Sequence, residues 1–477
     1  MMTAIRNRLF QGSFVRNGAV RRLALGVGIQ GLTFVIQTLL QFLSVPICLS
    51  AWGPVVYGDW LVLMAAGGLL MVADFGMQGH LGNGLRAAWA RGEQAAGQRI
   101  LQAGLGTYAL SLSVLLAVLA GSLMLLDVPS LLGVEQLEHP QATLVLLGLS
   151  TLLLLPRELT LSVYAARGQF SRQVGDFLVL TSAQQGTVIG VTLAGGSPIQ
   201  AAAAYGTVSL LVGWGVSLWS LRRRHPDVAF MPCRPAAAEL WELAVKSPFY
   251  GLQQSGGVLL VQLPVILLGR LSSPGAVVVF STMRTLTGVI RQFANQFATV
   301  AGLEMAHLYA RGDVAGTARL HRILCPVAGA VIGTISGVTL AVGPWFLGLW
   351  THGNVAFDRP LAATFVAAAV LMTPAYCAMG LLRLIGRPQP LALAMLLQAA
   401  AMILLALILI PDRDALGAAI AVGMAEIMVA TPIMLRAASR ALSSPILPVL
   451  VRTYAAAVVA GGCCLAMAAG IRAAIAG

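Results

Sequence analysis

Residues 389–411 read QPLALAMLLQAAAMILLALILIP, a stretch without a single charged side chain. A helix rises about 1.5 Å per residue, so about 20 apolar residues are enough to cross the hydrocarbon core of a bilayer. Twelve further apolar runs of comparable length lie between residues 23 and 471. The sequence therefore predicts an all-α, polytopic transmembrane protein.

The overall composition agrees with a chain that has lipid as its main solvent. Hydrophobic residues make up 58% of the 477 residues and charged residues only 10%, with a mean hydropathy of +0.84. Soluble domains are nearer 45–50% apolar and about 25% charged. The six cysteines form no CxxC or Cys/His cluster, and Walker A, HExxH and GxSxG motifs are absent. We therefore expect a protein that is not an enzyme and needs no metal or cofactor.

The basic residues indicate the orientation of the spans. The net charge is +13, but the Lys and Arg residues lie in short gaps between apolar runs instead of forming a basic patch, so we expect no nucleic-acid binding. With the N-terminus in the cytoplasm, all but seven of the 30 basic residues fall in cytoplasmic gaps. The exceptions are Arg270, Arg359, Arg413 and Arg472 in outer gaps and Arg157, Arg284 and Arg291 within spans.

A Pro-rich basic gap divides the chain into two predicted halves. Six spans precede this gap and six or seven follow it, which indicates two pseudo-symmetric six-helix bundles. The predicted segments are a basic cytoplasmic N-terminus (1–22), an N-terminal six-helix bundle (23–221), a cytoplasmic linker (222–246), a C-terminal six-helix bundle (247–435) and an additional, thirteenth transmembrane helix (450–471).

Short repeated loops support a duplication. Ala90-Arg91-Gly92-Glu93 and Ala310-Arg311-Gly312-Asp313 lie 220 residues apart (310 − 90), and Gly168 and Gly386 occupy similar later loops. Halves with the same orientation are related by an axis along the membrane normal. Such repeats are typical of transporters that work by alternating access, although short Arg/Gly loops also recur by chance.

Charged residues within the spans are the candidate site residues, because charge at bilayer depth is costly and usually faces a cavity or a partner. Arg284 and Arg291 are seven residues apart, so they lie on one face of a helix and about 10 Å apart along it. No acid lies near them in the same span, and two guanidinium groups suit a diphosphate or another anion. The alternative is that one of them reaches to the interface.

The other intramembrane charges admit two interpretations each. Arg157 either joins the cationic site or forms a structural pair with another helix; its neighbour Glu158 points elsewhere, so the two are expected to pair poorly. Asp74 and Glu426, like Glu158, either couple transport to an ion or neutralise an arginine.

Two short motifs carry a resemblance to a known family. Trp52-Gly-Pro-Val-Val-Tyr-Gly-Asp-Trp60 resembles a Gly-Pro-x-x-Tyr-Gly segment between the first two helices, and Ala73-Asp74-Phe75-Gly76 resembles an Asp-Leu-Gly element in the second helix. With the repeated loops, they resemble the Wzx-type O-antigen flippase branch of the multidrug/oligosaccharidyl-lipid/polysaccharide (MOP) exporter superfamily.

The resemblance implies a twelve-helix pair of bundles around a cationic cavity, in which Arg284, Arg291 and Arg157 would bind the substrate diphosphate. It implies a flippase that moves undecaprenyl-diphosphate-linked oligosaccharide, an O-antigen or exopolysaccharide repeat unit, to the periplasmic leaflet of a bacterial inner membrane. Polysaccharide polymerase and assembly proteins would be partners. The alternatives are a multidrug/cation antiporter of the same superfamily and a non-transporting scaffold of a glycan-assembly complex.

Overall fold

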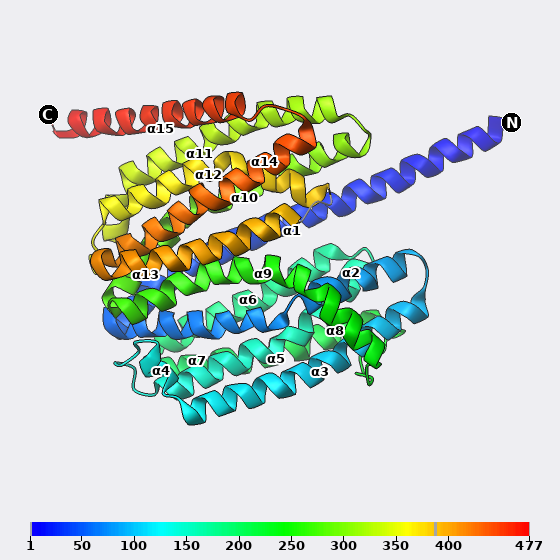
Figure 1. Cartoon of the computed structure of the whole chain (residues 1–477), viewed down its shortest axis with the longest axis horizontal. Coiled ribbons are helices and arrows are strands. Elements are labelled where there is room, and N and C mark those ends of the chain that lie inside the picture. Colours follow the sequence, from blue (N-terminus) through cyan, green and yellow to red (C-terminus); the bar gives the residue numbers. More distant parts are fainter. Residues whose placement is uncertain (1, 386–388, 477) are drawn as a thin grey trace. The chain divides into compact units, whose positions relative to one another are not determined.

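The computed structural model describes residues 2–385 and 389–476, and within these ranges the chain forms helices and no strand (Figure 1). The predicted loop glycine Gly386 lies outside the described residues, as do the side chains of the predicted basic N-terminus. The elements are α1 (Met2–Leu69), η1 (Leu70–Asp74), α2 (Met77–Ala90), α3 (Gln94–Leu125), α4 (Val128–Leu131), α5 (Pro140–Ala166), α6 (Phe170–Leu193), α7 (Pro198–Leu210), η2 (Leu211–Val216), α8 (Ser217–Arg224), α9 (Ala237–Leu271), α10 (Pro274–Ala310), α11 (Val314–Trp350), α12 (Arg359–Leu384), α13 (Gln389–Ala425), η3 (Glu426–Ala430), α14 (Thr431–Leu442) and α15 (Leu447–Ala476).

The predicted fold class is confirmed. Kinks at Gly53 in α1 and at Asp414 in α13 divide each of these helices in two, and the described chain then contains thirteen long helical segments, a twelve-plus-one arrangement. Nine described helices are long and apolar enough to cross a membrane, α1 and α13 among them. The protein is thus a multi-pass membrane protein. α6 and α10 are not among these nine, and both carry charged residues used below.

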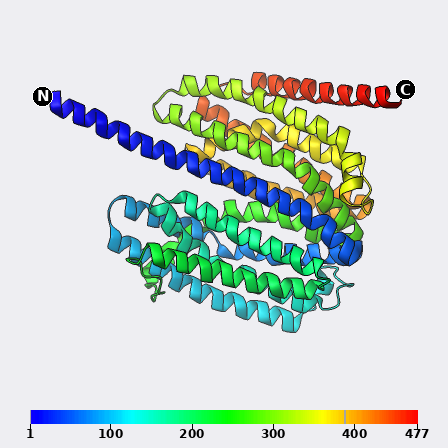
Figure 2. The same cartoon turned by 180° about the vertical axis from the view of Figure 1, so that it is seen from behind.

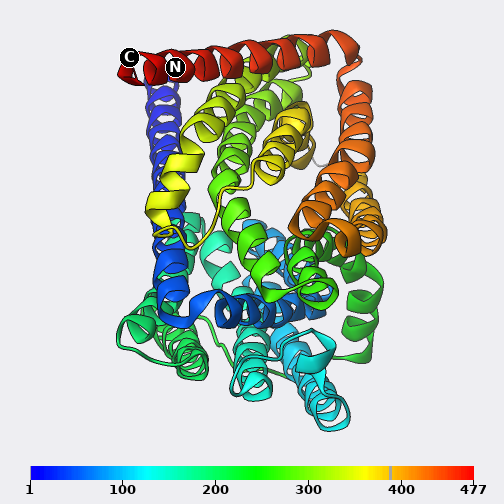
Figure 3. The same cartoon turned by 90° about the vertical axis from the view of Figure 1, so that its left-hand side faces the viewer.

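The Gly-Pro-x-x-Tyr-Gly segment forms the bend in α1 (Figure 3). Gly53 has φ 73°, a left-handed conformation that favours glycine. Pro54 begins the next helical segment, where the backbone N–H that proline lacks would have no partner within the helix anyway. Tyr57 is buried, and a Cβ at Gly58 would lie 2.3 Å from the carbonyl oxygen of Pro274 at the start of α10. These residues therefore set a turn and a close helix contact.

The predicted second span is not one regular helix. It becomes a 3₁₀ turn over η1, breaks at Phe75 and Gly76, which both have positive φ, and resumes as α2. Asp74 is buried at the end of η1. A Cβ at Gly251 of α9 would meet the Phe75 carbonyl at 2.7 Å, so α9 packs closely against this break.

The chain folds into two compact units. Unit 1 comprises Met1–Ser44, Met77–Gly121 and Val145–Ser247, and unit 2 comprises Val45–Gly76, Ser122–Leu144 and Pro248–Gly477. In unit 1, the non-helical stretch 225–236 packs against α3: the Cys233 amide donates to the Gln102 carbonyl (3.1 Å). A Cβ at Gly106 would collide with the Cys233 carbonyl, so the two backbones are in close contact. The boundaries of the predicted six-helix halves stay a prediction.

In unit 2, α12 is the central helix and α15 a peripheral one. The most apolar window of α12 is 83% buried, against 6% for α15. α15 runs along α11 (Figures 1 and 2), where a glycine stripe lets the backbones approach. A Cβ at Gly329, Gly333 or Gly337 would lie 2.4, 2.1 and 2.6 Å from carbonyl oxygens of α15. Small residues at four-residue spacing are the usual way for two membrane helices to pack this closely.

We expect Gly333→Leu to displace α15 and to lower the thermal midpoint of the detergent-solubilised protein, because the new side chain would collide with the Ala457 backbone. Overpacking of this kind costs roughly 1–3 kcal/mol. Gly462→Leu is the matched control, since open space surrounds Gly462 on α15. Equal midpoints for the two variants in differential scanning fluorimetry would contradict this account of the α11–α15 contact.

Candidate functional site

Unit 1 contains a buried charge cluster centred on Arg157 of α5. Its side chain is only 1% exposed. One terminal nitrogen donates to Glu158 Oε1 (2.6 Å), and the other donates to Asp176 Oδ1 of α6 and to Ser217 Oγ (3.3 Å). Nε donates to the Gly213 carbonyl (2.9 Å). Every nitrogen of the guanidinium is therefore already bonded within unit 1.

The cluster rests on an irregular turn of the last helix of unit 1. η2 is a π-helical turn, a geometry that interrupts the regular α-helical hydrogen bonds. Its Gly213 carbonyl accepts from Arg157, and the Ser217 hydroxyl that follows it donates to Asp176 Oδ1 (2.8 Å) and to the Val212 carbonyl (3.3 Å). Arginine, acid and π turn thus hold three helices together.

One expectation about Arg157 needs correction, and its contacts favour one of the two interpretations that the sequence left open. Arg157 and Glu158 do form an ion pair, because the arginine side chain is long enough to turn back toward its neighbour. The environment of Arg157 is also that of a structural pair with another helix, the second of the two interpretations, because Asp176 of α6 shares its charge. Full burial leaves no exposed cationic group at this residue.

Unit 2 contains a related pair. Arg291 of α10 donates two hydrogen bonds to Glu426, at 2.5 and 2.7 Å. Glu426 is the first residue of η3, another π-helical turn, and the Thr431 hydroxyl donates to the Glu426 carbonyl (3.0 Å). No acid lies near Arg291 in its own span, and the acid that pairs with it, Glu426, comes from a helix 135 residues away in sequence, in line with the interpretation of Glu426 as the neutraliser of an arginine.

The two π turns occupy corresponding places. η3 begins 215 residues after η2 (426 − 211), and each lies in the last helix of its predicted half. Each is followed by a hydroxyl residue, Ser217 or Thr431, that bonds back to a carbonyl five positions earlier. π turns are rare and are often found at functional sites.

Arg284 differs from the other two arginines. It lies on α10 two turns before Arg291, donates to the Val261 carbonyl of α9 (2.8 Å), and holds its guanidinium 5.3 Å from the Phe280 ring centroid. Among the described residues it forms no ion pair. Its charge is therefore balanced only by a carbonyl dipole and an aromatic face, both weaker than a carboxylate.

Sequence reasoning missed Asp176, Gly213 and Ser217. In the structure, Asp176 lies six residues inside α6. In the sequence, it stands at the edge of an apolar run, where an acid of a loop would also stand. Gly213 contributes only its backbone carbonyl, and since every residue has one, the sequence gives no sign of this role. Asp74 is buried in unit 2, near the break that separates η1 from α2.

Comparison with known proteins addresses the fold. No family model and no curated protein sequence matches the chain. Among solved structures, the lipid II flippase MurJ in an inward closed conformation superposes with a TM-score of 0.64 at 12% identity, covering 92% of this chain and 98% of that one. The chain has the fold of the MOP-superfamily transporters.

Multidrug transporters share this fold equally. An inward-facing multidrug resistance MATE family transporter of the MOP superfamily gives a TM-score of 0.62 at 12% identity, covering 85% of this chain and 95% of that one. The MATE multidrug transporter DinF-BH in complex with R6G gives 0.58 at 15% identity, covering 89% and 97%. The substrate therefore has to be argued from the residues of this chain.

We expect Asp176→Asn to destabilise the protein more than Glu158→Gln, because Asp176 is 13% exposed and Glu158 33%. Removing one partner of a buried pair costs roughly 3–5 kcal/mol in soluble proteins. Thermal midpoints in detergent would measure the difference. The double variant Arg157→Met/Asp176→Leu removes both charges of the more buried pair, and only the partly exposed Glu158 loses an arginine, so much of the loss should be recovered. A midpoint as low as that of Asp176→Asn would argue against the ion-pair role.

Proposed function

We propose that this protein is a transporter that moves a polyprenyl-diphosphate-linked oligosaccharide across a bacterial inner membrane, with its N-terminus in the cytoplasm. The observation that carries the proposal is Arg284, an arginine of a predicted span that has no acid partner among the described residues. An uncompensated charge at this depth is expensive, and proteins keep such charges mainly for function. The fold is compatible with this proposal and with drug transport alike.

A diphosphate supplies what Arg284 lacks. A guanidinium stays charged in any environment and offers paired N–H donors that match phosphate oxygens. The Val261 carbonyl takes a hydrogen bond from one terminal nitrogen of Arg284 and leaves the other N–H groups for a ligand. The headgroup would bring the missing negative charge, while the polyprenyl tail stays in the bilayer.

Arg291 is the proposed second ligand of the same substrate. It lies on the same face of α10, and its side chain is 26% exposed, whereas that of Glu426 is 8% exposed. The carboxylate therefore covers one edge of the guanidinium and leaves another open. A phosphate that approaches this edge would compete with Glu426, so binding of the anion would loosen α10 from the π turn η3.

A cation antiporter is less well supported by the carboxylates. It needs an acid that can exchange a cation, but Glu158, Asp176 and Glu426 each already contact an arginine. Asp74 is the buried acid whose role in coupling stays a prediction. Glycosyltransferase products would be the source of the substrate, and polysaccharide polymerase or assembly proteins would be the partners of a flippase.

We expect Arg284→Gln to slow transport strongly without loss of stability. In proteoliposomes that contain polyprenyl-diphosphate-linked oligosaccharide, the rate at which the glycan becomes accessible from the opposite side should fall about tenfold or more, since hydrogen bonds to charged groups contribute roughly 1.5–3 kcal/mol. The thermal midpoint should stay equal or rise, because the variant removes a half-buried charge that has no acid partner among the described residues. Arg284→Lys should restore only part of the rate, because lysine lacks the paired donors.

Arg359→Gln is the matched control, because Arg359 is an exposed arginine of unit 2 at the start of α12, and it should transport at the normal rate. Full activity of Arg284→Gln would refute the diphosphate site. Transport of an organic cation against a proton or sodium gradient, with no movement of the glycan, would instead establish the antiporter. Inactivity of the unaltered protein towards both substrates would favour the scaffold.

A further inference from the structure

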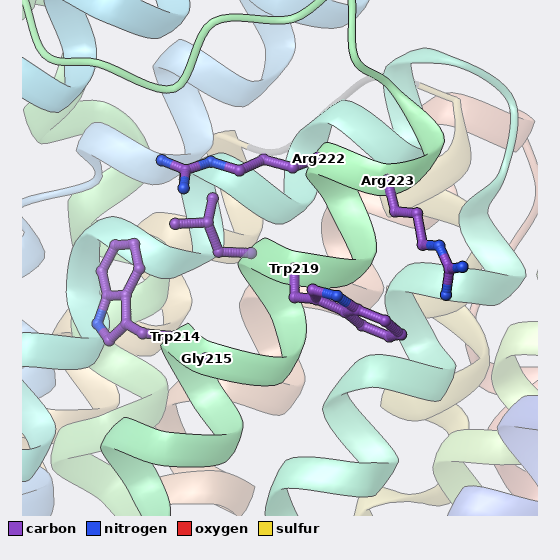
Figure 4. Close-up of a pocket in the computed structure, with 6 residues that line it drawn as sticks. Trp214, Gly215, Trp219, Arg222 and Arg223 are labelled. Atoms are coloured by element: carbon purple, nitrogen blue, oxygen red, sulfur yellow. The ribbon is translucent and has the colours of Figure 1, made fainter.

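A second candidate site lies at the end of the helix formed by α7, η2 and α8 in unit 1, and none of its residues belongs to the charge cluster. α7, η2 and α8 form one continuous helix that ends in Arg222, Arg223 and Arg224. A hollow of about 730 Å³ opens on its surface over the last three turns (Figure 4). It is lined by Trp214, Gly215, Leu218, Trp219, Arg222 and Arg223.

The lining residues form two neighbouring rows on one helix face. Trp214, Leu218 and Arg222 follow one another at four-residue spacing, and so do Gly215, Trp219 and Arg223. One row begins with a tryptophan and the other with a glycine, and both end with an arginine in the last turn of the helix. Gly215 leaves the space between the two indole rings, since no atom lies within 4 Å of a Cβ placed there.

The apolar part of the hollow fits the interface of a bilayer. The Trp214 indole is fixed by a hydrogen bond from its nitrogen to the Leu153 carbonyl (2.9 Å), whereas Trp219 is 61% exposed. Leu211 and Val216, on the same stretch, are exposed as well. A tryptophan about five residues from the end of a spanning helix is typical of the depth at which headgroups meet acyl chains.

The polar end of the hollow carries positive charge with no acid beside it. Arg222 and Arg223 are exposed and form no ion pair with any described residue. The Arg223 guanidinium lies 5.2 Å from the Trp219 ring centroid, which holds it over the aromatic floor. The nearby acid Asp227 is already paired: a hydrogen bond from Arg167 holds the pKa of Asp227 below its usual range.

We propose that this hollow binds the headgroup of an anionic phospholipid from the cytoplasmic leaflet. The phosphodiester would lie between Arg222 and Arg223, the glycerol region against Trp219, and one acyl chain along the Gly215 gap. Basic pockets on the cytoplasmic side of membrane helices bind anionic headgroups in this way. The hollow belongs to unit 1, whereas Arg284 and Arg291 belong to unit 2. Lipid binding in the hollow therefore does not depend on which substrate is transported.

Native mass spectrometry of the full chain, purified in detergent, tests the proposal with added phosphatidylglycerol and phosphatidylcholine as probes. The unaltered protein should retain phosphatidylglycerol in preference to phosphatidylcholine. Arg222→Gln/Arg223→Gln should weaken phosphatidylglycerol binding by roughly 30-fold. Each arginine near an anionic lipid surface contributes slightly more than about fivefold to the affinity, and the variant removes two. Millimolar inorganic phosphate should not displace the lipid, because it cannot use the apolar floor.

Two further variants separate this site from unspecific charge. Gly215→Leu places an apolar side chain in the hollow without changing charge, at a position where no atom lies within 4 Å of an added Cβ, and it should also weaken phosphatidylglycerol binding. Arg436→Gln/Arg440→Gln removes two exposed arginines from α14, the corresponding helix of unit 2, which has no tryptophan, and binding should be unchanged. The proposal is wrong if both arginine double variants lose binding equally, if Gly215→Leu binds normally, or if inorganic phosphate displaces the lipid.

Discussion

A guanidinium buried in a helical membrane bundle must find its counter-charges inside that bundle, and this constraint organises unit 1. Arg157 is 1% exposed and engages α5, α6 and the π turn η2 at once. Leaving any of these groups unpaired in a low-dielectric interior would be costly. The positions of three helices are thereby tied to one side chain, and the irregular turn supplies the backbone carbonyl that a regular helix would have used itself.

Unit 2 meets the same constraint in a simpler way. Arg291 and Glu426 pair across α10 and η3, and the hydroxyl of Thr431 supports the turn as that of Ser217 does in unit 1. The two halves thus share a device although their charged residues come from different helices. Arg284 does not follow this pattern. Its guanidinium contacts a carbonyl and an aromatic ring but no carboxylate among the described residues.

Among the described residues, this pattern separates the arginines that pair with an acid from the one that does not. All three looked alike as basic residues within apolar runs. Their partners divide them: Arg157 and Arg291 pair with acids 19 and 135 residues away, and Arg284 has no acid partner in the part of the chain that the structure describes. The same test distinguishes Arg167, which is paired with Asp227, from Arg222 and Arg223, which form no ion pair with a residue that the structure describes.

The sequence by itself determined the fold class and most of the long apolar helices, because the length and apolarity of a segment are local properties of the sequence. The run 389–411 became the first segment of α13, and the Gly-Pro motif became a bend because only local backbone geometry was involved. Only the tertiary structure decided which charges are neutralised, since Asp176 and Glu426 reach their arginines through helix packing and not through sequence spacing. It also decided where the helices become π turns, because a carbonyl freed in one helix is stabilised by a donor from another.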